Sequence, residues 1–137
     1  MNQHVDVPDF LRERNIFPTS QRVTIARVLF REHTHLTAEE IFRMVNEMDQ
    51  HVSKATVYNT LGLFAEKGIV REVIADPGRV VYDPNTTPHH HFYDEASGEL
   101  TDIDAASVEI RGLPPLPEGT ELQGVDVVVR IRRAGSR

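Results

Sequence analysis

The chain has 137 residues and a mass of 15.5 kDa, which suits one domain or two small units and excludes a large multidomain enzyme. It contains no cysteine, so disulfides, thiolate zinc sites, iron–sulfur clusters and cysteine nucleophiles are excluded. The net charge of −6 is unevenly distributed: residues 1–82 carry ten basic and eleven acidic side chains, whereas residues 83–137 carry five and ten. The negative sum argues at first against a nucleic-acid partner, so the distribution of charge matters more than its sum, and any metal must be bound by histidine and carboxylate.

The hydropathy pattern indicates a globular protein in the cytoplasm. No run of about 18 apolar residues is present, and the first ten residues lack the basic and apolar regions of a signal peptide. We therefore expect no membrane association.

Four short helices are predicted in the first half. Apolar periodicity and capping residues place them over 8–15, from Thr19 to Phe30, from Thr37 to Met48, and from Ser53 to Lys67. Thr37 with a glutamate three residues later is a capping box, and the glycine at 68 is a natural helix stop.

Two β-prone runs, 69–74 and 79–82, flank a turn at 76–78 and predict a hairpin. Several helices followed by a hairpin are typical of a winged helix, in which the helix before the hairpin enters the major groove of DNA. The sequence predicts an α+β fold, with an N-terminal winged helix-turn-helix domain over 1–83 and a small α/β dimerisation domain over 84–137. A helical bundle with an incidental hairpin is the alternative.

The fourth helix carries side chains suited to DNA contact. Basic, hydroxyl, amide and aromatic groups in its first turns bind phosphates or base edges. Arginines at the start of the second helix and in the hairpin are further phosphate contacts. The predicted DNA-binding residues are Arg22, Ser53, Lys54, Thr56, Tyr58, Asn59 and Arg79.

The second half, about 55 residues, is near the size at which a single core is marginal without a metal, a disulfide or oligomerisation. Its pattern predicts strands over 89–95 and 99–103, a short helix over 105–111, and a valine-rich final strand over 125–131. We expect that strand to pair with another chain. A symmetric homodimer would complete the core and place two reading helices on palindromic double-stranded DNA.

Three consecutive histidines begin the acidic half. Alternate side chains of a strand share a face, so His89 and His91 form a metal pair and His90 points the other way. Asp83, Asp102 or Glu95 supply carboxylates, and His35 links the first half to the second. Such nitrogen and oxygen ligands suit Fe²⁺, Mn²⁺ or Zn²⁺, and the lack of thiolate favours the harder ions. A solvated surface cluster is the alternative.

Several motifs together carry a family resemblance: TSQR at 19–22, HLTAE at 35–39, ATVYNTL at 55–61 and HHH at 89–91. In this order and spacing the chain resembles the ferric uptake regulator family. Within it, PHHHFY at 88–93, GELTDI at 98–103, LPPLPEG at 113–119 and VDVVVR at 125–130 look most like the iron response regulator branch.

The resemblance implies a dimeric, metal- or haem-responsive repressor of iron homeostasis genes that binds AT-rich palindromic operators. It implies a sensory site formed by His35, Asp83, His89, His91 and Asp102. A second site would use His90, Glu109 and Asp126, although a histidine is common at the last position. The family's cysteine-held structural zinc cannot form, because Asp94 and Ser97 replace the first cysteine pair. Haem would bind through the histidine run, and the Cys-Pro haem motif of some members is missing.

Three other functions are compatible with parts of the sequence. A peroxide-sensing regulator of the same family would use the same ligand set. A cupin-type metalloenzyme fits His89-x-His91-x-x-x-Glu95 but needs a later histidine, and none follows residue 91. A metal-storage protein would not need the reading helix. We therefore expect a regulator and not an enzyme.

Overall fold

The computed structural model describes residues 6–32, 35–48 and 51–134. The chain divides into two compact units, Met1–Thr86 and Thr87–Arg137. None of the helices in the described ranges is both long and apolar enough to span a bilayer.

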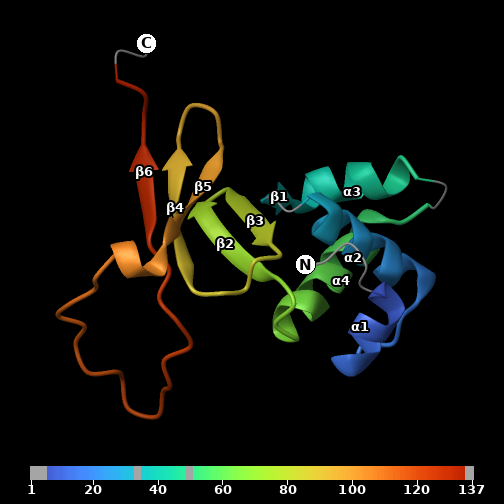
Figure 1. The fold of residues 1–137 in the computed structure, drawn as a ribbon, viewed down its shortest axis with the longest axis horizontal. Helices are drawn as coiled ribbons and strands as arrows, with labels where there is room; N and C mark the ends of the chain where they lie inside the picture. Colours follow the sequence, from blue (N-terminus) through green and yellow to red (C-terminus); the bar gives the residue numbers. More distant parts are fainter. Residues whose placement is uncertain (1–5, 33–34, 49–50, 135–137) are drawn as a thin grey trace. The chain divides into compact units, whose positions relative to one another are not determined.

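The first unit contains four helices (Figure 1): α1 (Val7–Glu13), α2 (Ser20–Glu32), α3 (Ala38–Asn46) and α4 (Lys54–Glu66). The four predicted helices are confirmed, with ends that differ from the expected ones by a few residues.

Capping side chains define where these helices begin and end. The Thr37 hydroxyl accepts a bond from the Glu40 N–H, and the Glu40 carboxylate accepts one from the Thr37 N–H, so the predicted capping box is present. Ser53 caps α4 by accepting from the Thr56 N–H at 3.1 Å. Gly68 follows α4 with φ of 77°, a left-handed conformation that costs glycine little.

A three-stranded sheet completes the first unit. Its strands are β1 (Leu36–Thr37), β2 (Arg71–Asp76) and β3 (Arg79–Asp83), in the order β1-β3-β2 and antiparallel throughout. The predicted hairpin is β2–β3, and the Asp76 carboxylate closes its turn by accepting from the Gly78 N–H at 3.0 Å. Helices followed by this hairpin form the expected winged helix.

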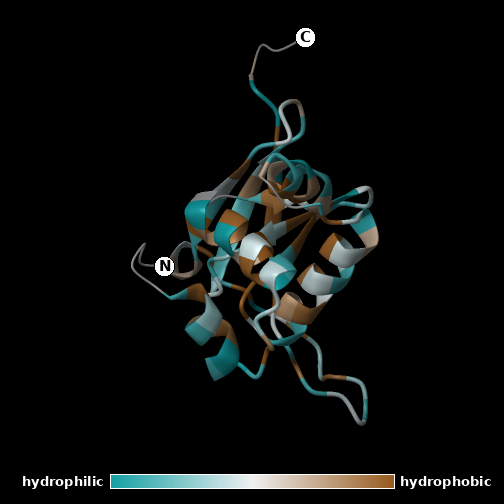
Figure 2. Cartoon of the chain, turned by 90° about the vertical axis from the view of Figure 1, so that its right-hand side faces the viewer, coloured by the Kyte–Doolittle hydropathy of each residue, from teal (hydrophilic) through white to brown (hydrophobic). Residues whose placement is uncertain are grey.

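The core of the first unit lies between the helices. Figure 2 shows that these helices carry both hydrophilic and hydrophobic segments, as amphipathic helices do. The fully buried side chains come from every helix and include Leu11, Ile25, Leu29, Ile41, Val45, Val57, Leu61 and Phe64. Burial of one face of α4 fixes which residues of that helix remain outside.

The second unit is a three-stranded sheet with β4 (His89–Asp94) in the centre. β5 (Leu100–Asp104) pairs with it antiparallel, and β6 (Val128–Ile131) pairs with it in parallel. The single helical turn in the described part of this unit is the 3₁₀ turn η1 (Ala105–Ser107).

Two expectations for the second unit are corrected. The helix predicted over 105–111 is wrong: after η1 the backbone turns extended at Val108, and β-branched residues and Gly112 do not favour continuation. The final strand begins at Val128, not at 125, and its first partner is β4 of the same chain instead of another chain. Because β6 is an edge strand of the described sheet, its outer side is still positioned for such pairing.

Candidate nucleic-acid interface and candidate metal ligands

The exposed face of α4 carries the predicted reading residues. One side of the helix is packed into the core through Val57, Thr60, Leu61 and Phe64. This packing fixes the rotation of the helix about its axis and leaves Lys54, Tyr58 and Asn59 exposed on the other side. These three side chains offer a cation, a phenol and an amide, which are groups that contact phosphates and base edges.

Ser53 and Thr56 are partly used within the cap. The Ser53 hydroxyl donates to the Thr56 hydroxyl oxygen at 3.0 Å while it accepts from the Thr56 N–H. The Thr56 hydroxyl accepts that bond and keeps its own proton for donation. Ser53 therefore stabilises the helix end, and Thr56 is the better placed of the two for an outside acceptor.

The two predicted arginines differ in their surroundings. Arg22 donates from Nη1 to the Phe17 carbonyl at 3.0 Å, which braces the chain before α2. Arg79 is partly buried at the start of β3, and its Nε has no hydrogen-bond partner in the described part of the chain. Arg79 therefore keeps one donor that the described residues leave unsatisfied.

Arg79 lines a cavity of about 440 Å³ together with Tyr58, Glu39 and Tyr82. Burial raises the pKa of Tyr82, and Glu72 and Tyr58 raise it further, so this phenol stays protonated. The sequence reasoning missed Glu39 and Tyr82, because no local pattern connects either of them with α4.

The first unit brings two predicted metal ligands together. The His35 Nε2 lies 3.1 Å from Asp83 Oδ2, and both side chains are largely buried. The pairing of β1 with β3 explains this contact, because Leu36 opposes Tyr82 and the next pair outward is His35 with Asp83. The other Asp83 oxygen accepts from the Asn85 N–H at 2.9 Å.

The second unit brings together the other three. Asp102 on β5 opposes His91, and its Oδ1 lies 3.7 Å from His89 Nε2 and 3.5 Å from His91 Nε2. His91 is 1% exposed and His89 5%, whereas Asp102 is 48% exposed. The predicted alternation is confirmed, because both outer histidines meet the same carboxylate.

The neutral tautomer of His89 suits metal ligation. The His89 Nδ1 lies 2.6 Å from the Thr87 carbonyl, which can only accept, so Nδ1 carries a proton and the neutral ring has its lone pair on Nε2, on the Asp102 side. A ligand histidine held by a carbonyl in this way is the usual outer-sphere arrangement around protein metals. The donor set, imidazole nitrogen plus carboxylate oxygen, fits a divalent ion.

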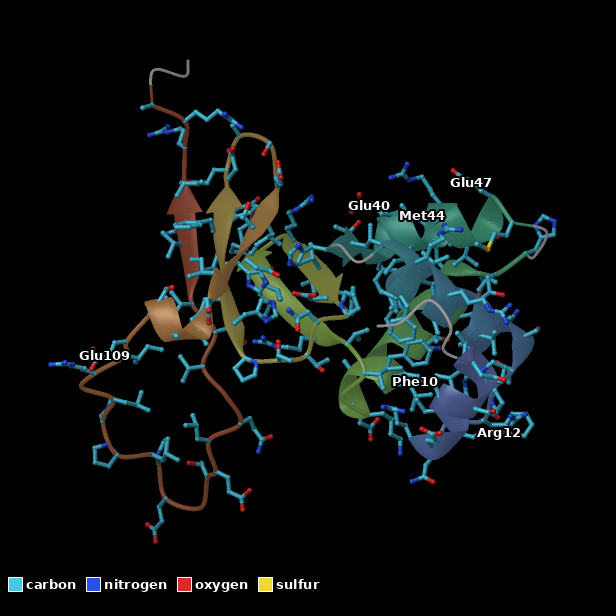
Figure 3. The ribbon with its side chains drawn as sticks, in the orientation of Figure 1. Phe10, Arg12, Glu40, Met44, Glu47 and Glu109 are labelled. Carbon is cyan, nitrogen blue, oxygen red and sulfur yellow. The ribbon has the colours of Figure 1, made fainter. Side chains whose placement is uncertain are left out.

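His90 lies on the opposite face, and its Nδ1 accepts from the Val127 N–H at 3.0 Å. The ring proton of neutral His90 is then on Nε2, so a metal would have to displace either this proton or the Val127 bond. Glu109 pairs with Arg111 at 2.7 Å on the long loop between η1 and β6, away from the strands (Figure 3). The described residues do not gather His90, Glu109 and Asp126 into one cluster.

The model of the ferric uptake regulator family matches residues 13–129. The peroxide-responsive repressor PerR of Staphylococcus aureus strain Mu50 is 38% identical over 93 residues, which cover 68% of this chain and 63% of that protein. The chain thus spans less than two thirds of the length of that curated relative.

Solved structures agree with the fold. The manganese-containing ferric uptake regulator of Pseudomonas aeruginosa superposes with a TM-score of 0.74 at 26% identity, over 95% of this chain and 99% of the other. The peroxide stress regulator of Campylobacter jejuni superposes with a TM-score of 0.63 at 21% identity, over 94% and 97%, which shows a shared fold. The family resemblance is therefore confirmed, and this chain belongs to the ferric uptake regulator family.

Proposed function

We propose that this protein is a metal-dependent transcriptional repressor that binds double-stranded DNA as a homodimer in the cytoplasm, and that it is not an enzyme. The observation that carries the proposal is the exposed face of α4, which presents Lys54, Tyr58 and Asn59 and on which Tyr58 shares a cavity lining with Arg79 of the wing hairpin. Membership of the ferric uptake regulator family supports the same function.

The DNA contacts follow from the chemistry of that face. Lys54 and the Thr56 hydroxyl bind phosphate near the helix N-terminus, whose dipole favours negative charge. Tyr58 and Asn59 meet base edges or a thymine methyl group. Arg79, which is partly buried in the wing hairpin, would contact a phosphate of the backbone. Arg22 and Ser53 support these contacts by fixing the starts of α2 and α4.

The regulatory metal would be held by His35, Asp83, His89, His91 and Asp102. Five residues, 84–88, separate Asp83 from His89, so the two ligand sets are close along the chain. A divalent ion held by these residues would supply positive charge that attracts carboxylates and neutral imidazoles of both units. Metal binding and the orientation of the units then become one equilibrium, and a coupling of about 1–3 kcal/mol gives about 5- to 150-fold regulation.

The second unit would supply the dimer interface. Its described residues leave large apolar side chains exposed on the long loop and on β6: Ile110, Leu113, Leu116, Leu122, Val125, Val129 and Ile131. A second copy would bury them and place two α4 helices on an AT-rich palindromic operator.

Two observations favour different chemical signals for this regulator. The motifs at 88–93 and 98–103 favour the iron response branch, with repression of iron homeostasis genes and haem as a further ligand of the histidine run. The 38% identity to a protein named peroxide-responsive repressor favours peroxide sensing. Fe²⁺ transfers an electron to hydrogen peroxide readily and Mn²⁺ does not. Loss of DNA binding on peroxide treatment of the Fe²⁺ form alone would identify a peroxide sensor, and a Soret band on haem titration would identify a haem sensor.

A salt-dependent gel shift tests the function itself. The purified chain is incubated with AT-rich palindromic and scrambled duplexes, with Mn²⁺ and after chelation. We expect specific retention of the palindrome and a change in affinity of about fivefold or more between the two metal states. Equal retention of both duplexes in both states would refute a metal-dependent repressor.

A further inference from the structure

Glu39, at the start of α3, contacts two of the proposed reading residues of α4. Its Oε1 accepts from the Tyr58 hydroxyl at 3.5 Å and lies 3.4 Å from the Lys54 ammonium. Lys54 and Tyr58 are four residues apart in a helix and therefore lie on the same side of it. One carboxylate oxygen thus serves both side chains.

Lys54 is directed over α3 by a second contact. Its ammonium nitrogen lies 5.7 Å from the centroid of the Phe42 ring, within the range of a cation–π interaction. The Lys54 and Glu39 side chains are 58% and 57% exposed. A pair this open to water is weak and exchanges easily for another partner.

We propose that Glu39 is a specificity-determining residue that lowers affinity for DNA of any sequence and positions Tyr58 for the operator; this rests on the proposed reading role of α4. When the Lys54 ammonium pairs with a DNA phosphate instead of with Glu39, the Glu39 carboxylate stays beside the negatively charged DNA backbone. This like-charge cost arises on every sequence. The repulsion between Glu39 and the phosphates is offset only on a duplex whose bases Tyr58 contacts.

The positioning role follows from the space next to Tyr58. The 440 Å³ cavity that Tyr58 lines with Glu39, Arg79 and Tyr82 leaves this side chain room for other orientations. The Glu39 carboxylate holds the Tyr58 hydroxyl at the α3 side of that cavity. Loss of this acceptor should therefore weaken operator binding more than binding to other DNA.

Two substitutions separate charge from positioning. Glu39→Gln removes the charge and keeps an oxygen acceptor for Tyr58, whereas Glu39→Ala removes both. Glu47→Gln is the matched control, because Glu47 is exposed just beyond the other end of α3; Figure 3 shows Glu40 and Glu47 at opposite ends of this helix. The Mn²⁺-loaded full chain is titrated with the duplex best retained from a randomised palindromic library, and with its scrambled version, at several salt concentrations.

Glu39→Gln should raise affinity for the scrambled duplex about two- to fivefold and steepen the salt slope by about one, relative to Glu47→Gln. Glu39→Ala should in addition lower the ratio of selected to scrambled affinity, and this loss should disappear in a Tyr58→Phe background. If Glu39→Gln and Glu47→Gln behave alike and Glu39→Ala leaves the affinity ratio unchanged, the inference is overturned. The function itself fails separately, when Lys54→Ala and Tyr58→Ala leave the parent's affinity for the selected duplex unchanged.

Discussion

The rings of His89 and His91 meet edge to face, with centroids 4.5 Å apart and planes at 65°. Both project from one side of β4 toward Asp102, while His90 is bonded to the Val127 N–H on the other side. Three identical neighbours in the sequence thus have two different roles in the fold.

The first prediction separates these roles. His89→Ala or His91→Ala should abolish stoichiometric Mn²⁺ or Fe²⁺ binding and uncouple DNA affinity from metal. His90→Ala should keep both and lose about 1–3 kcal/mol of stability, since the Val127 N–H loses its acceptor. Metal analysis and denaturant unfolding measure the two effects. Equal loss of metal response in His90→Ala would instead favour a haem or whole-cluster site.

A second prediction concerns the reading helix. Tyr58→Ala should cost about 1–3 kcal/mol of operator binding and relax sequence preference, because a base contact is lost. Lys54→Ala should weaken all sequences alike and flatten the salt slope by about one. Lys67→Ala, at the opposite end of α4, is the matched control and should change neither. Unchanged operator affinity in both Tyr58→Ala and Lys54→Ala would remove α4 from the interface.

A third prediction locates the dimer contact on β6. Val127 is half-buried and bonded to β4, so a charge there would damage the fold itself. Val129 is 37% exposed on the edge strand, and Val129→Asp should yield monomers because it places a charge in an apolar interface. Thr101→Asp, exposed on β5, is the control. A dimer of unchanged sedimentation in Val129→Asp would exclude this strand.

A fourth prediction uses the turn after β4. Asp94 accepts from the Ala96 N–H at 2.9 Å and the Ser97 N–H at 3.3 Å, and these bonds, with the Arg133 charge 3.7 Å away, lower its pKa below the ordinary value of 3.8. A lowered pKa in the folded state means that this carboxylate stabilises the fold above about pH 4 and loses its effect as the pH falls through the folded value. In Asp94→Asn, the free energy of unfolding should therefore depend less on pH between about pH 5 and 2 than it does in the parent. Parallel pH profiles for parent and variant would show that Asp94 does not contribute.

Local signals in the sequence determined the elements of the first unit. The Ser53 cap, the Thr37–Glu40 capping box and the turn at 76–78 act between residues two or three apart, so they can be read without the fold. The alternation that separates His90 from its neighbours is equally local. The family resemblance adds the predicted metal ligands to what these local patterns indicate.

The tertiary structure decided the contacts between residues far apart in the chain. Glu39 meets Tyr58 across 19 positions and His90 meets Val127 across 37, and no periodicity encodes either pair. The parallel pairing of β6 with β4 has the same origin. Backbone propensity is weak beside the packing and hydrogen bonding that the whole unit supplies, so these features depend on the completed sheet.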